Sequence, residues 1–174
     1  YDSQTVNAVF RAFADYFTYG GFPESVNIVQ KRQWLSSLYQ KIFLGDLIAR
    51  YKIRNDIALK LLVKKLSESI KQPSSFNRLA NIVSSTGHKI QIPTVMEYMK
   101  FMEETWLLFS ISNYAGKFAE KDSAKKYYFR DNGILNLFLT DPETSLLENR
   151  VAIELKKLYG DEVYFYNKAV EVDF

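Results

Sequence analysis

Apolar residues recur every three or four positions along the first third of the chain, which is the spacing of amphipathic helices. The pattern predicts one helix over Thr5–Tyr19 and a second from about Ser25 to Leu44, separated by Gly20-Gly21-Phe22-Pro23. A third, strongly periodic helix is predicted from Ile57 to Ile70, with Asn55-Asp56 as its cap. The amino-terminal region is therefore expected to be helical.

The middle of the chain changes from helical spacing to a composition typical of strands. Short helices are predicted at Phe76–Val83 and from Thr94 onward. Residues 107–114 and 125–130 are rich in β-branched and aromatic side chains and are separated by a polar loop, which predicts a hairpin. Three helices followed by a hairpin is the order of a winged-helix domain, which we place at residues 56–132.

The last part of the chain returns to a mixed pattern. Helices are predicted at residues 132–139 and 145–158, and strands at residues 163–166 and 170–174. The predicted fold class is mainly α with a small β component. Its expected parts are a helical connector at residues 1–55, the winged-helix domain at 56–132 and a truncated α/β domain at 133–174.

Composition excludes several kinds of site. With 47% hydrophobic residues the chain can form a sizeable core, and no apolar run approaches the roughly 20 residues that a membrane span requires. The absence of cysteine excludes a disulfide, a thiol nucleophile and a thiolate zinc site, and the single histidine, His88, excludes a histidine-rich metal site. We expect a soluble protein of the cytoplasm without a membrane partner.

Positive charge is concentrated in the middle of the chain. Residues 31–130 carry 18 Lys and Arg against 8 Asp and Glu, whereas residues 131–174 carry 4 against 9. A basic region of this kind is typical of binding to the phosphates of duplex DNA without sequence preference, but a solvated lysine-rich surface has the same composition. The cations expected to contact DNA surround the hairpin: Lys117, Lys121, Lys125, Lys126 and Arg130.

The helix that begins at Thr94 is a poor candidate for reading the DNA groove. Its expected exposed positions are Glu97, Lys100, Glu103 and Glu104, and this excess of negative charge opposes insertion between phosphates. A winged helix that serves as a scaffold for docking on another protein is therefore the alternative hypothesis. The abundant aromatic residues, Trp34 and Trp106 included, are interpreted as core.

Two carboxylates near the end of the chain lie in an order typical of metal-dependent nucleases. Glu148 opens the predicted helix, and Asp173 lies in the last predicted strand, where alternation places it on the same face as Glu171. A hard divalent cation needs further oxygen ligands, so this pair is an incomplete site. The alternative is that Glu148 is favoured by the helix dipole alone. Because the chain starts at Tyr1 and stops within a strand-like run, we expect it to be a fragment.

Several short stretches, in the same order and spacing, resemble the bacterial and archaeal AAA-type ATPases that carry an uncharacterised C-terminal domain. They include Tyr-Gly-Gly-Phe-Pro-Glu at 19–24, Ile-Pro-Thr-Val at 92–95, Lys-Tyr-Tyr-Phe-Arg-Asp at 126–131, Leu-Glu-Asn at 147–149, Val-Tyr-Phe-Tyr at 163–166 and Glu-Val-Asp-Phe at 171–174.

This resemblance implies a parent with an ATPase core that uses ATP and Mg²⁺, followed by a winged helix and a restriction-endonuclease-like nuclease fold. In that fold Glu148 and Asp173 match the carboxylates of the metal site. The following strand of the family, with its Glu-x-Lys pair, is absent from this sequence, as is a phosphate-binding G-x-x-x-x-G-K-[ST] loop. We therefore expect no catalytic residue in this chain alone, and no cofactor bound by it; the expected partners are DNA and the ATPase domain.

Overall fold

The computed structural model describes residues 2–115, 124–168 and 170–174, with the side chains of residues 42–44 and 46 excepted. Its helices are α1 (Ser3–Tyr19), α2 (Lys31–Leu38), α3 (Ile48–Tyr51), α4 (Asp56–Glu68), α5 (Phe76–Ser85), α6 (Ile92–Glu104), α8 (Asn132–Asn136) and α9 (Glu143–Tyr159). A 3-10 turn at Pro23–Ser25 precedes α2, and a π-helix at Tyr39–Leu47 joins it to α3. The fold is mainly α with a small β component, as the sequence predicts.

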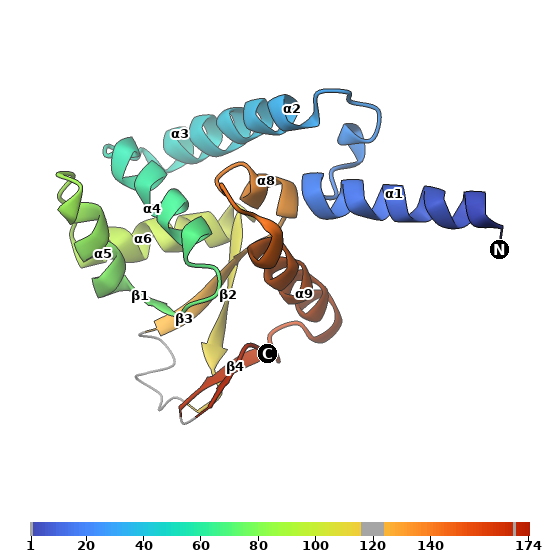
Figure 1. Cartoon of the computed structure of the whole chain (residues 1–174). Helices are drawn as coiled ribbons and strands as arrows, with labels where there is room; N and C mark the ends of the chain where they lie inside the picture. Colours follow the sequence, from blue (N-terminus) through green and yellow to red (C-terminus); the bar gives the residue numbers. More distant parts are fainter. Residues whose placement is uncertain (1, 116–123, 169) are drawn as a thin grey trace.

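The strands form one mixed sheet in the order β1-β3-β2-β4-β5. They are β1 (Ser74–Ser75), β2 (Leu108–Asn113), β3 (Ala124–Phe129), β4 (Tyr164–Asn167) and β5 (Glu171–Val172). β3 pairs antiparallel with both β1 and β2, whereas β4 lies parallel to β2, with Ser112 opposite Tyr164. The hairpin and the carboxyl-terminal strands therefore share a sheet across the predicted boundary at residue 132 (Figure 1).

The central elements follow the order of a winged helix. α4, β1, α5 and α6 precede the β2–β3 hairpin, and the short β1 pairs with the start of β3. Their apolar positions meet in the core, where Leu62, Leu79 and Phe129 are fully buried. The spacing of the apolar residues thus predicts both the helices and the face that each one buries.

Helix α1 differs from the sequence interpretation in what its apolar face contacts. No residue of α1 is buried, and Val9 and Phe10 are 63% and 67% exposed. Figure 1 shows α1 extending away from the rest of the molecule, with only its carboxyl end close to other elements. Within the described ranges no helix, α1 included, has the length and apolarity needed to cross a membrane.

Helix α2 begins at Lys31, later than the predicted start near Ser25. Pro23 opens a 3-10 turn, and the Ser25 hydroxyl donates to the carbonyl of Phe22 at 2.7 Å, so the chain turns before it becomes helical. Phe22 then packs edge-on against Trp34, with ring centroids 6.1 Å apart. Trp34 therefore packs beside the core, as predicted.

The prediction that Trp106 is a core residue is wrong. Its side chain is 71% exposed, and its backbone has a φ of 61°, a left-handed conformation that is rare for bulky residues. The backbone N–H of Trp106 donates to the carbonyl of Glu103, and the backbone N–H of Leu107 donates to the carbonyl of Met102. These two hydrogen bonds end α6 and turn the chain into β2. The left-handed residue directs the indole outward.

A buried amide connects β3 to α9. β1 covers β3 only at residues 124 and 125, so the edge of β3 has no strand partner at Phe129. The Asn149 side chain takes that place: it accepts from the Phe129 N–H at 2.8 Å and donates to the Phe129 carbonyl at 3.0 Å. It also donates to Asn132, which in turn donates to the carbonyl of Phe17 at the end of α1.

We expect Asn149→Ala to lower the free energy of unfolding by about 3 kcal/mol, because it leaves the buried amide and carbonyl of Phe129 unpaired. Urea unfolding followed by circular dichroism measures the change. Asn77→Ala on the exposed side of α5 is the matched control and should leave stability nearly unchanged. Equal effects of the two substitutions would contradict the proposed role of Asn149.

Candidate functional site

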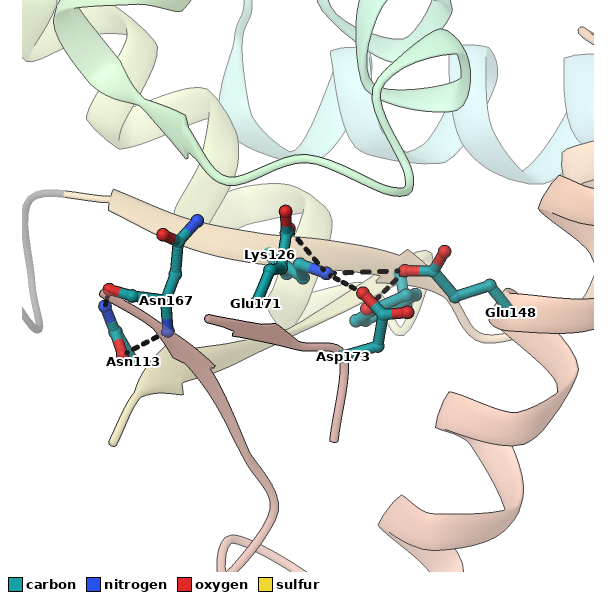
Figure 2. Close-up of polar contacts among 7 residues, drawn as sticks. Asn113, Lys126, Glu148, Asn167, Glu171 and Asp173 are labelled. Atoms are coloured by element: carbon teal, nitrogen blue, oxygen red, sulfur yellow. Dashed lines mark hydrogen bonds and ion pairs between the residues drawn. The ribbon is translucent and has the colours of Figure 1, made fainter. Parts of the chain in front are cut away.

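A lysine at the centre of the sheet brings three carboxylates together. The Lys126 side chain is fully buried although it lies on β3, within the hairpin expected to face DNA. Its Nζ lies 2.6 Å from Oδ1 of Asp173 and 3.7 Å from carboxylate oxygens of both Glu148 and Glu171. Figure 2 shows its ammonium group joined by dashed lines to Glu148, Glu171 and Asp173.

The carboxylates of this lysine–carboxylate cluster come from separate elements. Glu148 lies in the second turn of α9 and is 11% exposed, whereas Glu171 on β5 and Asp173 just beyond it are each 53% exposed. Alternation along the strand points Glu171 and Asp173 to the same side, as the sequence predicts. The structure thus brings together Glu148 and Asp173, the two residues selected from the sequence.

Burial controls the protonation of the inner part of the cluster. Desolvation raises the pKa of Glu148, and it also raises the pKa of Tyr128, so the Tyr128 hydroxyl keeps its proton. That hydroxyl donates to Oε1 of Glu148 at 2.9 Å, and this hydrogen bond and the positive charge of Lys126 both oppose the rise in the pKa of Glu148. Three carboxylates and one ammonium leave the ionised cluster with a formal charge of −2.

These side chains do not by themselves fit a magnesium ion. The ammonium of Lys126 already contacts both Glu148 and Asp173, as a metal bound by both would do. In the described part of the chain, no group of three or more His, Cys, Asp and Glu side chains is arranged to hold a metal ion. Lys126, which the sequence interpretation assigned to DNA, instead supplies the cation of this site.

Of the other residues predicted to contact DNA, the structure describes Lys125 and Arg130. Arg130 follows the opposite end of β3 from Lys126, and its guanidinium stacks 4.4 Å from the ring centroid of Trp106. Lys125 is half-buried, and Lys117 and Lys121 lie outside the described residues. The prediction that Lys126 faces DNA phosphates is wrong, because a side chain without exposed area cannot reach them.

Helix α6 carries acidic side chains at its surface. Glu97 is exposed, and Lys100 pairs with Glu104 at 3.6 Å, so its one cation is partly neutralised. Tyr51 from α3 stacks on Phe101 with a centroid distance of 3.8 Å and donates to Glu104 at 3.0 Å. Tyr51, in the connector at residues 1–55, therefore covers part of α6, the helix that reads the DNA groove in winged-helix domains.

Sequence reasoning missed the structural role of Asp131, Asn132 and Asn149, which lie in or beside the short stretches at 126–131 and 147–149. Asp131 caps α8 and accepts the N–H of Gly21 at 2.8 Å, which brings the Tyr-Gly-Gly stretch onto the hairpin end. A Cβ on Gly20 would lie 2.1 Å from the Asp131 carboxylate, so this approach requires glycine. The available signal was the recurrence of Asn and Asp beside apolar positions at 131, 132 and 149.

Comparison with known proteins identifies the family of the chain. A family model described as "Domain of unknown function (DUF8612)" matches residues 10–145, and the chain belongs to this family. An uncharacterized protein of Methanocaldococcus jannaschii is 27% identical over 167 residues, which cover 92% of this chain and 38% of that protein. An uncharacterized protein of Haemophilus influenzae is 28% identical over 161 residues, covering 88% of this chain and 40% of that protein. The chain thus spans about two fifths of the length of these relatives, and no solved structure matches it significantly.

We expect Lys126→Met to lower the free energy of unfolding at pH 7 by about 1.5–3 kcal/mol, because Asp173 loses its charged hydrogen-bond donor and the other carboxylates lose a nearby cation. The substitution also removes a charge that lowers the pKa of Glu148, so this pKa rises further in the folded protein. A raised carboxyl pKa costs stability above that pKa, and the cost disappears as the pH falls below the pKa of the unfolded chain.

Urea unfolding at several pH values measures this difference. The destabilisation should be largest at neutral pH and should shrink toward pH 4. Lys100→Met, which removes the exposed pair with Glu104, is the control and should have a small effect at every pH. A penalty for Lys126→Met that does not depend on pH would contradict the charge argument.

Proposed function

We propose that this member of the DUF8612 family is a docking and regulatory module of a longer ATP-hydrolysing protein. The observation that carries the proposal is the apolar face of α1, which we call the α1 face. Its side chains are Val6, Val9, Phe10 and Phe13, which are between 40% and 67% exposed. A contiguous exposed apolar stripe of this kind is typical of an interaction site, and we propose that it packs against the rest of the longer protein.

The lengths of the relatives support this proposal. The matched relatives contain more than twice the length of this chain, which leaves room for a catalytic domain. The six stretches that resemble AAA-type ATPases point to a P-loop core as that domain. ATP and Mg²⁺ would then bind outside this chain, whose sequence has no phosphate-binding loop. A cytoplasmic location is part of the same proposal.

Docking is better supported than non-specific binding of DNA. Of the described cations near the hairpin, Lys126 is held by carboxylates and Arg130 by an indole ring. Lys125 is half-buried, and Lys117 and Lys121 lie outside the described residues. In the docking proposal the winged helix is a scaffold, which agrees with the partial covering of α6 by Tyr51.

A second candidate function, metal-dependent cleavage of DNA by the longer protein, is favoured by one observation. Glu148 and Asp173 meet at the same ammonium group, and the cluster keeps a formal negative charge when ionised. This candidate requires further ligands from outside the chain, because the described side chains do not fit a metal ion. The hairpin lysines would then contact the backbone of the DNA substrate.

Phe10→Ser with Phe13→Ser in the longer protein tests the docking proposal. If both rings are buried against another domain, the double substitution removes about 2 kcal/mol of apolar burial per ring. We expect the thermal midpoint of the longer protein to fall by several degrees and its ATPase rate to change by at least threefold.

Gln4→Ser with Arg11→Ser, on the opposite side of α1, is the matched control and should change neither quantity. The docking proposal is wrong if both double variants behave like the wild type. If the longer protein does not hydrolyse ATP, the assignment to an ATPase is wrong. Docking by the α1 face is then still tested by the change in the thermal midpoint.

Glu148→Gln and Asp173→Asn in the longer protein test the second candidate. We expect each substitution to reduce Mg²⁺-dependent cleavage of a linear DNA duplex by at least a hundredfold, with ATP hydrolysis unchanged. Glu97→Gln, on the exposed side of α6, should cleave like the wild type. No cleavage by the wild type, or equal cleavage by all three variants, would exclude this function.

A further inference from the structure

A cavity of about 440 Å³ lies on a different part of the molecule from the lysine–carboxylate cluster. It is enclosed by the Gly21-Phe22 loop, the start of the π-helix at Tyr39, the turn at Trp106 and helix α9. Its volume falls within the range of roughly 300–1,000 Å³ that is usual for small-molecule sites. None of Lys126, Glu148 and Asp173 lines it.

The cavity wall combines apolar side chains with three cations. Phe22, Leu38, Leu107, Ile134 and Ile153 supply apolar surface. The cations are Arg130, Arg150 and Lys157, and the last two both pair with Glu154 on the same helix. Arg130 differs from them, because it makes no salt bridge with any residue that the structure describes.

The guanidinium of Arg130 is held by rings rather than by acids. Its Cζ lies 4.4 Å from the ring centroid of Trp106 and 5.3 Å from that of Phe109. Its Nε is buried and has no hydrogen-bond partner among the described residues. A buried donor without a partner costs free energy in the folded protein. The guanidinium therefore has hydrogen-bonding capacity that the described residues do not use.

The neighbouring acid does not neutralise this cation. Asp131 also lines the cavity, but its carboxylate accepts the backbone N–H groups of Gly21 at 2.8 Å and Ile134 at 3.0 Å. Its hydrogen-bonding capacity is thus directed to the loop and to the start of α8. Glu103 and Asp161 lie close enough to interact electrostatically with Arg130, but neither forms a salt bridge with it in the described part of the chain. Arg130 therefore offers a cation without a directly bonded acid at the wall of a mostly apolar cavity.

Trp106 supplies a flat surface at the same place. Its indole is 71% exposed and lines the cavity, and its left-handed backbone holds it outside the core. A bulky residue in this conformation costs about 1–2 kcal/mol, and such residues concentrate at ligand-binding sites. The residue beside Arg130 is therefore one on which a ring system can stack.

We infer that this cavity binds a flat, apolar small molecule that carries one anionic group. The ring system packs against Trp106 and the apolar wall, and the anionic group accepts hydrogen bonds from Arg130. A carboxylate, sulfonate or phosphate meets this requirement, since each presents oxygen acceptors that match the guanidinium fork. This inference is independent of docking by the α1 face.

Fluorescence titration with 8-anilino-1-naphthalenesulfonate tests the inference. The chain has two tryptophans, so Trp34→Phe leaves Trp106 as the single emitter at the cavity. We expect saturable quenching of Trp106 with one probe bound per chain. The uncharged analogue N-phenyl-1-naphthylamine should bind at least tenfold more weakly, because it lacks the anionic group.

Two substitutions separate the charge of Arg130 from its packing. Arg130→Gln should weaken binding of the sulfonate at least tenfold and leave binding of the neutral analogue unchanged, whereas Arg130→Lys should keep part of the preference. Lys100→Gln, on the exposed side of α6, is the control and should bind both probes as the chain without this substitution does. Circular dichroism verifies that each variant is folded.

The inference is overturned if the Trp34→Phe chain binds the two probes with equal affinity. It is also overturned if folded Arg130→Gln and Arg130→Lys variants both bind the sulfonate as tightly as that chain does. Quenching that never saturates indicates general adsorption to apolar surface and would also overturn it. If Trp34→Phe does not fold, the affinities of the two probes are compared in the chain with both tryptophans, with the fluorescence of the bound probe as the signal.

Discussion

The fold depends on how the backbone N–H and carbonyl of Phe129, at the edge of β3 that faces away from β2, find hydrogen-bond partners. Phe129 pairs with Leu108 of β2 on one side, but among the described residues no strand pairs with it on the other side, and an unpaired peptide group in a buried place would be costly. The amide of Asn149 makes the two hydrogen bonds that a neighbouring strand would make, and its remaining N–H donates to Asn132. Through this single side chain, α9, α8 and the end of α1 are all positioned relative to the hairpin. Residues of the stretches at 19–24, 126–131 and 147–149 meet near this side chain, through the contacts of Asn149 with Phe129 and of Asp131 with Gly21.

Periodicity predicts most of the secondary structure, because each helix in the central part buries one apolar face. It fails where another element is required to cover that face. α1 has the pattern of a helix packed on a core, yet Val9 and Phe10 face solvent in this chain. Trp106 shows a second limit: its size suggests the core, but the turn that closes α6 imposes a left-handed backbone and directs the ring outward. Neither outcome can be read from composition alone.

The candidate site was predictable in part. Alternation along the last strand and the position of Glu148 at the start of a helix were enough to select two carboxylates that meet in the structure. Lys126 was assigned to the wrong surface, because the sequence does not show that Glu148 and Asp173 lie against its side chain. The parallel pairing of β2 with β4 decides this, and it joins residues more than 50 positions apart. Long-range pairing of that kind leaves little local signal.

The adjacency of Glu148 and Asn149 has a mechanical consequence. Lys126 lies on the sheet and Asp173 directly follows its last strand, so a rigid movement of the sheet preserves their 2.6 Å contact. Glu148 belongs to a helix, and sliding of that helix along the sheet is the displacement that would open the cluster. The next residue, Asn149, resists this sliding, because it is hydrogen-bonded to the sheet backbone. Asn149 therefore opposes the displacement that would separate Glu148 from Lys126 and Asp173, and the hairpin and α9 are expected to move together.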